Sequence, residues 1–352
     1  MNRRAFLASV SGLAATGAVL PGIAKEPAGI RVTSNTLPRK VIIGTAIEDL
    51  VGAYPGLEQR LTQLTGLVDR LVEQSSQKYG RSPDLAILTE MAVTGEAGED
   101  VRACAVPLEG PLREAFSRKA KEHHCYIVAP TYLRSADGKR CSNAAILFGR
   151  DGAVAGVYHK VHLVPDDDSE ILESGSTPGT AVPVFQCDFG RLGIQICYDM
   201  EFDYGWDELA RRGCELVAWP TQSPQTATPA FRAMHGLYYV VSSTWRNNAS
   251  IFEPSGRIAA HILEPEKLLT YEIDLSYAIL PWSDKLENGK ALQKQFGERI
   301  GFHYYEEEDR GIFWSNDPRT TIREMVHSFG LEERHEQLTR VQQVYRKAGL
   351  QA

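Results

Sequence analysis

The sequence predicts a mixed α/β fold, and three features of the chain indicate it. Compact runs of β-branched and apolar residues alternate with helical patterns in the first part of the chain, and hairpin patterns join them later. This combination favours mixed sheets over purely parallel ones. The chain has 352 residues, 43% hydrophobic and 24% charged, which is enough for one large domain or two medium ones. Its composition excludes a disordered or repetitive protein.

The first predicted elements alternate strictly. KVIIGTAI at 40–47 is a compact β-branched run and predicts a buried strand. Leucine and valine recur at three- and four-residue spacing over 57–72, which predicts an amphipathic helix. A strand, LAIL, then ends at Thr89 and Glu90, and a helix over 112–122 leads into the strand CYIVAP.

Hairpins appear in the second part of the predicted domain. Residues 143–148 and 153–157 predict a hairpin about Asp151-Gly152 that ends near Lys160, and an acidic loop covers 164–179. Strands are expected over 182–189, in the apolar run that ends at Cys197, and over 214–219. Helices are expected from about 204 and over 231–238. A further strand at 239–244 precedes a hairpin turning at 254–256. The pattern loosens from 280, apart from a final amphipathic helix at 331–345.

The charge pattern narrows the class of partner. The formal net charge is −7, and no Lys/Arg cluster occurs beyond the N-terminus, so a nucleic-acid partner is not expected. A small neutral or cationic molecule fits better. His159 and His162 flank Lys160 close to acidic residues, but no metal-ligand spacing recurs, so we expect neither a metal nor another cofactor.

The N-terminal residues resemble a twin-arginine export signal. Residues 1–24 carry Arg3 and Arg4, then a mildly apolar run and small residues, and 25–39 reads as a connector. The apolar run is too short to favour a transmembrane helix, so no stable membrane insertion is expected; an uncleaved anchor is the alternative. We therefore expect a periplasmic or extracellular protein. The six cysteines lack paired spacing, and no disulfide framework is predicted.

Three reactive residues stand at the ends of three separate apolar strands. Glu90 follows LAILT, Lys160 follows the hairpin, and Cys197 follows LGIQI. Side chains at equivalent ends of neighbouring strands converge on one cleft, where α/β sheets bind ligands. Taken singly, each residue type more often has a structural role: glutamate at the surface, lysine in solvent and cysteine in the core.

The motifs ILTE, YHKVHL and GIQICYD, in this order and spacing, resemble the Glu-Lys-Cys signature of the carbon-nitrogen hydrolase (nitrilase) superfamily. Supporting similarity runs from about 40 to 273. The resemblance implies an αββα sandwich that pairs into four-layered dimers and larger assemblies, so a homodimer or larger homo-oligomer is expected. It also implies a catalytic domain over 40–280, with 281–352 as an extension for packing or subunit contact.

The resemblance assigns roles to these residues. Cys197 is the nucleophile, Glu90 the general base, and Lys160 with the backbone NH of Tyr198 the holder of the oxyanion. The family often supplies a second glutamate. Glu173 is our choice because a Pro-Gly follows it at about the family distance. Glu170 is the rival, since the insertion PDDDSE leaves the alignment with the family uncertain at this point. Both glutamates also fit a solvated acidic loop.

The residues around Cys197 bear on the substrate. Cys-Tyr-Asp resembles the amidase and carbamoylase branches, whereas nitrilases typically carry Cys-Trp-Glu. Glu201 stands where many relatives carry arginine; it disfavours an anionic substrate if it faces the cleft, or it pairs with Arg211 or Arg232. Further candidates for substrate binding, in segments that border the pocket in relatives, are Trp219, Gln222 and Arg232.

The function expected from the sequence is an exported hydrolase that cleaves a non-peptide C–N bond. The substrate is a small linear amide or N-carbamoyl compound, cleaved through a cysteine thioester with release of ammonia or an amine. The alternatives are nitrile hydrolysis, acyl transfer from the same thioester, and a catalytically silent binding or scaffold protein.

Overall fold

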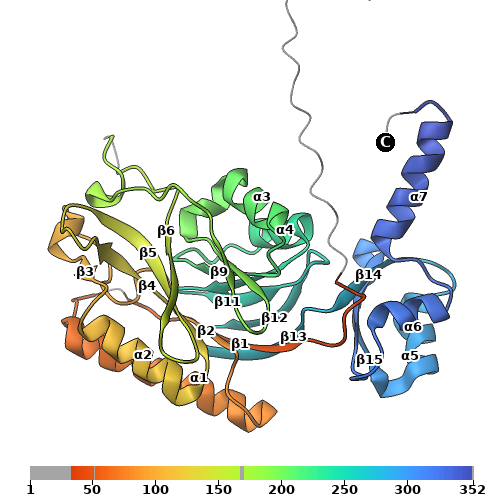
Figure 1. Ribbon diagram of the computed structural model, residues 1–352, viewed down its shortest axis with the longest axis horizontal. Coiled ribbons are helices and arrows are strands. Elements are labelled where there is room, and N and C mark those ends of the chain that lie inside the picture. The colour runs from red at the N-terminus through yellow and green to blue at the C-terminus, as the bar shows by residue number, and fades with distance from the viewer. Residues whose placement is uncertain (1–32, 51, 167–169, 351–352) are drawn as a thin grey trace, which may run out of the picture. The chain divides into compact units, whose positions relative to one another are not determined.

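The computed structural model describes residues 33–50, 52–166 and 170–350 of the chain (Figure 1). The predicted signal segment at 1–24, the start of the connector and part of the PDDDSE insertion lie outside these ranges. Among the helices of the described ranges, none is long and apolar enough to cross a membrane.

Two mixed sheets form the main part of the structure. The first has the order β13-β1-β2-β4-β5-β6, with β3 against β4, and the second has the order β12-β11-β10-β9-β8-β7. In the first sheet the strands are β1 (Lys40–Ala46), β2 (Leu85–Ile87), β3 (Val106–Pro107), β4 (Tyr126–Arg134), β5 (Cys141–Phe148), β6 (Val154–His159) and β13 (Leu268–Asp274). In the second they are β7 (Val184–Gln186), β8 (Arg191–Ile194), β9 (Leu216–Pro220), β10 (Tyr239–Ser243), β11 (Asn248–Phe252) and β12 (Ile258–Leu263).

Helices cover the outer face of each sheet (Figure 1). Helices α1 (Leu57–Tyr79) and α2 (Pro111–His123) pack their apolar stripes on the first sheet, and α3 (Asp203–Arg211) and α4 (Ala227–Gly236) pack on the second. The inner faces of the two sheets share one apolar core, in which Ile43 and Leu147 belong to the first sheet and Ile194 and Val241 to the second. This is the αββα sandwich that the resemblance predicted.

The predicted elements agree with the structure in type and differ at their ends. Helix α1 continues two turns past the predicted end at 72, because polar residues there complete an exposed last turn capped by Gly80. Helix α4 begins before the predicted start at 231, since Thr226 and Pro229 suggest a loop although proline is tolerated in the first turn. Strand β13, the edge strand antiparallel to β1, lacks a clear signal in the sequence.

The C-terminal residues form more regular structure than their loosened pattern suggests. Strands β14 (Tyr277–Pro281), β16 (Arg310–Ser315) and β15 (Ile300–Tyr305) make a three-stranded antiparallel sheet, and the acidic run at Glu306–Glu308 is the turn between β15 and β16. Helices α5 (Lys290–Phe296) and α6 (Ile322–Ser328) share a small core with this sheet. Helix α7 (Arg334–Lys347) contains no buried residue.

Candidate active site

The structure brings Glu90, Lys160 and Glu173 into one buried cluster. The Lys160 ammonium donates to Glu90 Oε1 over 3.0 Å and makes a second ion pair with Glu173 Oε1. The Val164 backbone NH also donates to Glu173 Oε1, over 3.1 Å. Glu170 is exposed, so of the two rival acids Glu173 is the one that contacts Lys160.

Asn143 is a member of this cluster that the sequence reading did not single out. Its side-chain NH₂ donates to Glu90 Oε1 over 2.9 Å and to Glu173 Oε2 over 3.1 Å. Asn143 lies on β5, next to the end of β6 that leads to Lys160, and its carbonyl accepts the Lys160 backbone NH over 2.9 Å. A polar amide at the start of the apolar run NAAILF is the signal that could have identified it.

The charges in this cluster reinforce one another. Burial by itself lowers the pKa of Lys160, but the negative charges of Glu90 and Glu173, and that of Cys197 once its thiol ionises at high pH, raise it above its ordinary value. The lysine therefore stays an ammonium. For Glu173, burial raises the pKa, and the nearby Lys160 ammonium offsets only part of that rise.

Cys197 occupies a strained position at the end of the second sheet. Two residues separate it from the end of β8, and it begins a 3₁₀ turn (Cys197–Glu201). Its φ is 40°, which is unusual for a residue other than glycine. The Trp219 indole NH donates to its carbonyl over 3.1 Å and so helps to hold this backbone. Cys197 as a residue is neither fully buried nor exposed.

The thiol of Cys197 is protonated at neutral pH. Burial and then the charge of Glu90 raise its pKa, and the opposing effects of Lys160 and a hydrogen bond with Thr221 leave it at about 12. Lys160 alone therefore does not generate a thiolate in the resting site. A base must remove the proton during the reaction.

Asp199, two residues after Cys197, braces the turn from inside. Its Oδ2 accepts the Ile196 backbone NH over 2.9 Å and the Tyr158 hydroxyl over 2.7 Å. Its Oδ1 accepts the His162 backbone NH over 2.9 Å. Asp199 is completely buried, and it thus ties the Cys197 turn to the strand end that carries Lys160.

A cavity of about 340 Å³ opens beside Cys197. Its other lining residues are Asp49, Glu96, Gln222, Ser223, Trp245 and Arg246. The Trp245 indole NH donates to the Glu90 carbonyl over 2.9 Å, which fixes one wall of the cavity to the Glu90 strand end. The cavity beside the reactive cluster is lined by both acidic and basic side chains, and it is large enough for a small molecule.

The remaining candidates lie in different environments. Gln222 lines the cavity, whereas Trp219 is completely buried behind Cys197. Arg232 is also buried, and its guanidinium binds the Met200 carbonyl over 2.9 Å and the Asp203 carboxylate. Its contacts are therefore with the turn that follows Cys197 and with α3.

The ion pairs proposed for Glu201 are not the ones that form. Glu201 is exposed and accepts the Gln225 side-chain amide over 3.1 Å. Arg211 binds Glu208 on the same helix, and Arg232 binds Asp203. The expectation of a Glu201–Arg211 or Glu201–Arg232 pair is wrong because both arginines have nearer carboxylates.

Two clusters of metal-ligating types occur in the described ranges, and neither contains a residue of the Cys197 site. Asp69, Glu122 and His123 form one, and His327, Glu333 and Glu336 the other. In each cluster a cation already compensates the acids: Lys119 contacts Asp69 over 2.7 Å, and Arg323 contacts Glu333 over 3.2 Å. These contacts fit ion-pair networks without a metal.

Comparison with known proteins agrees with this geometry. The family model described as carbon-nitrogen hydrolase matches residues 52–280. Similar proteins include omega-amidase NIT2-A of Xenopus laevis, 28% identical over 49% of this chain and 70% of that protein, and omega-amidase NIT2 of Danio rerio, 24% identical over 60% and 83%. The crystal structure of Saccharomyces cerevisiae Nit3, a member of the nitrilase superfamily, is 19% identical and covers 68% of this chain and 91% of that one, with a TM-score of 0.59. The chain therefore belongs to the carbon-nitrogen hydrolase family and is a hydrolase of non-peptide carbon–nitrogen bonds.

Proposed function

We propose that this protein hydrolyses small linear amides or N-carbamoyl compounds through a thioester on Cys197. The observation that carries the proposal is the arrangement of Glu90. Its Oε1 accepts hydrogen bonds from Lys160 and Asn143, whereas its buried Oε2 has no hydrogen-bond partner among the described residues. One oxygen is thus fixed in place, and the other is available to exchange a proton with the Cys197 thiol and the substrate.

In the first half of the reaction, Glu90 takes the thiol proton as Cys197 Sγ forms a bond to the carbonyl carbon of the substrate. The carbonyl π electrons move to oxygen, where the Lys160 ammonium and the Tyr198 backbone NH hold the negative charge. The oxyanion then reforms the carbonyl and the C–N bond breaks. Glu90 gives its proton to the departing nitrogen, which leaves as ammonia or an amine.

In the second half, water adds to the thioester and Glu90 accepts the proton of that water. The C–S bond breaks, the sulfur regains the proton from Glu90, and the acid product leaves. Glu90 acts as base and acid in turn, and it is an anion beside the Lys160 ammonium whenever it has given its proton away. The second glutamate, Glu173, helps by holding the other side of the Lys160 ammonium.

The lining of the Cys197 cavity supports an amide substrate that carries its own charges. Arg246 offers a site for a carboxylate, and Asp49 and Glu96 offer sites for an ammonium or for amide NH groups. The names of the similar omega-amidases support an amide, as does the Tyr198-Asp199 sequence after the nucleophile.

Ammonia release over a panel of linear amides, N-carbamoyl amino acids and nitriles tests the proposal. We expect the highest kcat/KM for a member of the first two groups and loss of all turnover in Cys197→Ala. Adding hydroxylamine to the wild-type enzyme should yield a hydroxamate, because this nucleophile intercepts a thioester. A nitrile as the best substrate, or turnover by the alanine variant, would overturn the proposal.

The same assay separates the competing functions. Product that retains the acyl group on an added amine or thiol, in preference to water, would indicate acyl transfer. No turnover of any compound, with Cys197 unreactive towards iodoacetamide in the folded protein, would indicate a scaffold.

We also propose that the protein is exported and forms a homo-oligomer. Export rests on Arg3 and Arg4 and the apolar run after them, and replacing both arginines by lysine should retain the protein in the cytoplasm on cell fractionation. The oligomer rests on exposed aromatic residues, Tyr204 on α3 and Phe231 on α4. Light scattering should give the mass of more than one chain, and Phe231→Asp should lower it.

A further inference from the structure

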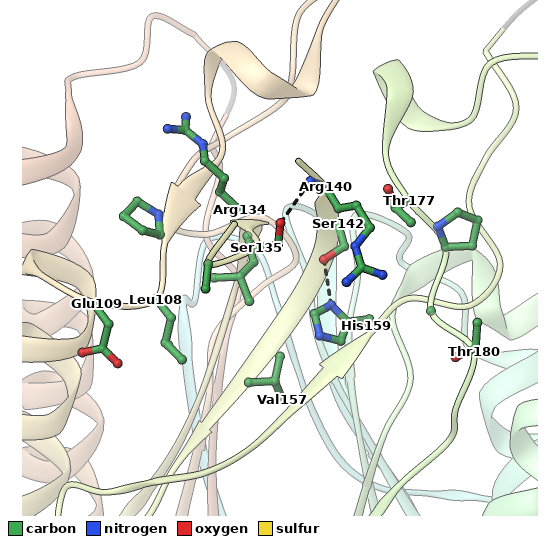
Figure 2. Close-up of a pocket in the computed structure, with 15 residues that line it drawn as sticks. Leu108, Glu109, Arg134, Ser135, Arg140, Ser142, Val157, His159, Thr177 and Thr180 are labelled. Atoms are coloured by element: carbon green, nitrogen blue, oxygen red, sulfur yellow. Dashed lines mark hydrogen bonds between the residues drawn. The ribbon is translucent and has the colours of Figure 1, made fainter. Parts of the chain in front are cut away.

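A second and larger cavity, of about 650 Å³, is lined in part by Ser142 of β5 and by Val157 and His159 of β6 (Figure 2). It is formed by residues from β3 and the loop after it, the ends of β4 and β5, β6, and the segment 177–180. Most of the lining is apolar, contributed by Leu108, Leu133, Val157 and Pro178. None of its residues belongs to the reactive cluster described above.

Polar groups lie on both sides of this cavity, and one group of them surrounds His159, whereas Glu109 and Arg134 lie on the other side (Figure 2). Ser142 Oγ lies 2.7 Å from His159 Nδ1, and Figure 2 shows the Arg140 guanidinium beside the His159 ring. Partial removal from water and the positive charge of Arg140 lower the pKa of His159, so this ring is neutral at neutral pH. The Thr177 side chain lies on the same side of the cavity as His159.

Arg140 is a cation without an ion pair among the described residues. The acid on its own turn, Asp137, is engaged by the Ser135 hydroxyl over 2.6 Å and by the Lys139 backbone NH over 3.1 Å. Glu109, the acid that lines the cavity, is paired with Arg113 at 2.5 Å. The positive charge of Arg140 is thus available to a ligand.

We propose that this cavity is an effector site for a small amphipathic carboxylate. The carboxylate would bind Arg140, with the Thr177 hydroxyl and the free nitrogen of His159 as further partners, and its apolar chain would lie against Leu108, Leu133 and Val157. A largely apolar cavity with a small number of placed polar groups is the usual form of a site for a small molecule. Arginine is the side chain best shaped to bind a carboxylate with two hydrogen bonds.

We assign an effector role to this site because the strands that line the cavity, β5 and β6, also carry or lead into residues of the reactive cluster. Ser142 and His159 face the cavity, and the next residue after each, Asn143 and Lys160, belongs to the cluster; successive residues of a strand point to opposite faces. The Gly179 backbone NH also donates to the Lys160 carbonyl over 2.8 Å. A ligand that fixes this ribbon therefore acts on the positions of Asn143 and Lys160.

Glu173 lies four residues before the segment 177–180 that lines the cavity. The Thr177 backbone NH donates to the Cys141 carbonyl over 2.7 Å, so the segment is bound to β5 as well as to Lys160. A Cβ on Gly179 would lie 2.1 Å from the His159 carbonyl oxygen, which shows how closely the segment approaches β6. A ligand that shifts 177–180 would therefore act on Lys160 through the Gly179 hydrogen bond, and on Glu173 through the chain that links it to Thr177.

Titration calorimetry with hexanoate, on the full chain, tests the site without reference to activity. We expect hexanoate to bind the wild-type protein and Arg140→Gln to weaken the binding at least tenfold. Arg118→Gln is the matched control, because Arg118 is an exposed arginine of α2 that does not line this cavity, and it should bind as the wild type does. Arg246→Gln, in the Cys197 cavity, should also retain the binding.

The outcomes separate this proposal from the catalytic one. Equal binding by Arg140→Gln, loss of binding in Arg246→Gln, or equal binding of hexylamine would each overturn the effector site. If the site exists, hexanoate should also change kcat or KM in the wild type and in Arg118→Gln but not in Arg140→Gln. The kinetic readout rests on the proposed hydrolysis, whereas the calorimetry does not depend on any activity. Binding of hexanoate without any change of kcat or KM would overturn the effector role.

Discussion

Glu173 and Glu170 are three residues apart in the acidic loop, yet their environments are opposite. Glu173 contacts the Lys160 ammonium, the Asn143 amide and the Val164 backbone NH, whereas Glu170 is exposed to solvent. A buried carboxylate that fixes a lysine contributes through that lysine's position and charge. Glu173 is accordingly a positioning residue for Lys160.

We predict that Glu173→Gln lowers kcat by about 10²-fold, because a neutral amide holds the Lys160 ammonium less firmly. Glu170→Gln is the matched control, since it removes the same charge from an exposed position of the same loop, and it should leave kcat within about twofold of the wild type. Steady-state kinetics on the best substrate of the panel measures both. Equal losses in the two variants would mean that the loop acts only through its total charge.

We predict that Cys197 carries no thiolate in the resting enzyme at neutral pH. Its pKa is raised to about 12 by burial and the charge of Glu90, so the proton is lost only as the pH rises towards that value. The thiolate ultraviolet absorbance of the wild type minus that of Cys197→Ala, followed from about pH 6 to pH 10, measures this. A difference signal that is already complete near neutral pH would show a preformed thiolate and remove the need for Glu90 as base.

At the scale of elements, the buried Asp199 side chain braces the 3₁₀ turn after β8. The two carboxylate oxygens of Asp199 each accept a backbone NH, that of Ile196 immediately before the turn and that of His162 beyond Lys160. The strained φ of Cys197 persists because this turn is fixed from both sides. The position of the nucleophile relative to Lys160 therefore depends on Asp199.

We predict that Asp199→Asn lowers the free energy of unfolding by about 1–3 kcal/mol, because the amide NH₂ would face a backbone NH and leave it unsatisfied. It should also lower kcat, since the Cys197 turn loses its tie to the Lys160 strand end. Tyr158→Phe removes the hydroxyl that donates to Asp199 and accepts from the Gln195 side-chain amide, and it should cost about 1 kcal/mol. Chemical denaturation measures both; an Asp199→Asn variant as stable and active as the wild type would contradict this role.

At the scale of the whole molecule, the C-terminal sheet shares the core of the sandwich. Tyr277 and Ile279 on β14 and Ile312 on β16 are buried in the same apolar cluster as residues of the two main sheets. The expected boundary at residue 280 stays a prediction. The extension nevertheless contributes to packing within the described chain, whatever it contributes to subunit contact.

We predict that ending the chain at Leu280 yields an unstable or insoluble protein, because Ile312 is lost and Tyr277 and Ile279 become exposed. Ending it at Glu336 should leave the thermal unfolding temperature within a few degrees, since α7 contains no buried residue and the Glu333 contact with Ser34 is kept. Circular dichroism on heating measures both variants. A soluble, active protein ending at Leu280 would show that the sandwich folds without the extension.

The sequence was informative about those reactive residues that stand within a short local motif. Glu90, Lys160 and Cys197 could be proposed because each follows an apolar strand within a recognisable motif. The alternation of elements predicted a mixed α/β fold, and the family resemblance predicted the sandwich. Asn143 was missed because the only local signal, a polar amide at the start of the apolar run NAAILF, does not show that it meets Glu90 and Glu173 from other parts of the chain. The partners of Glu201 were mispredicted because separation along the chain does not tell which carboxylate reaches an arginine first.

The sequence by itself determined the family, the order of the elements and the residue types available for the reaction, since local periodicity and short motifs depend on near neighbours only. The tertiary structure decided which glutamate contacts Lys160, that Asp199 braces the Cys197 turn, and that a second cavity adjoins the β5–β6 ribbon. These facts depend on residues from separate strands meeting at one place. Distances across two packed sheets follow from the packing of the whole core, and no local stretch of the chain contains them.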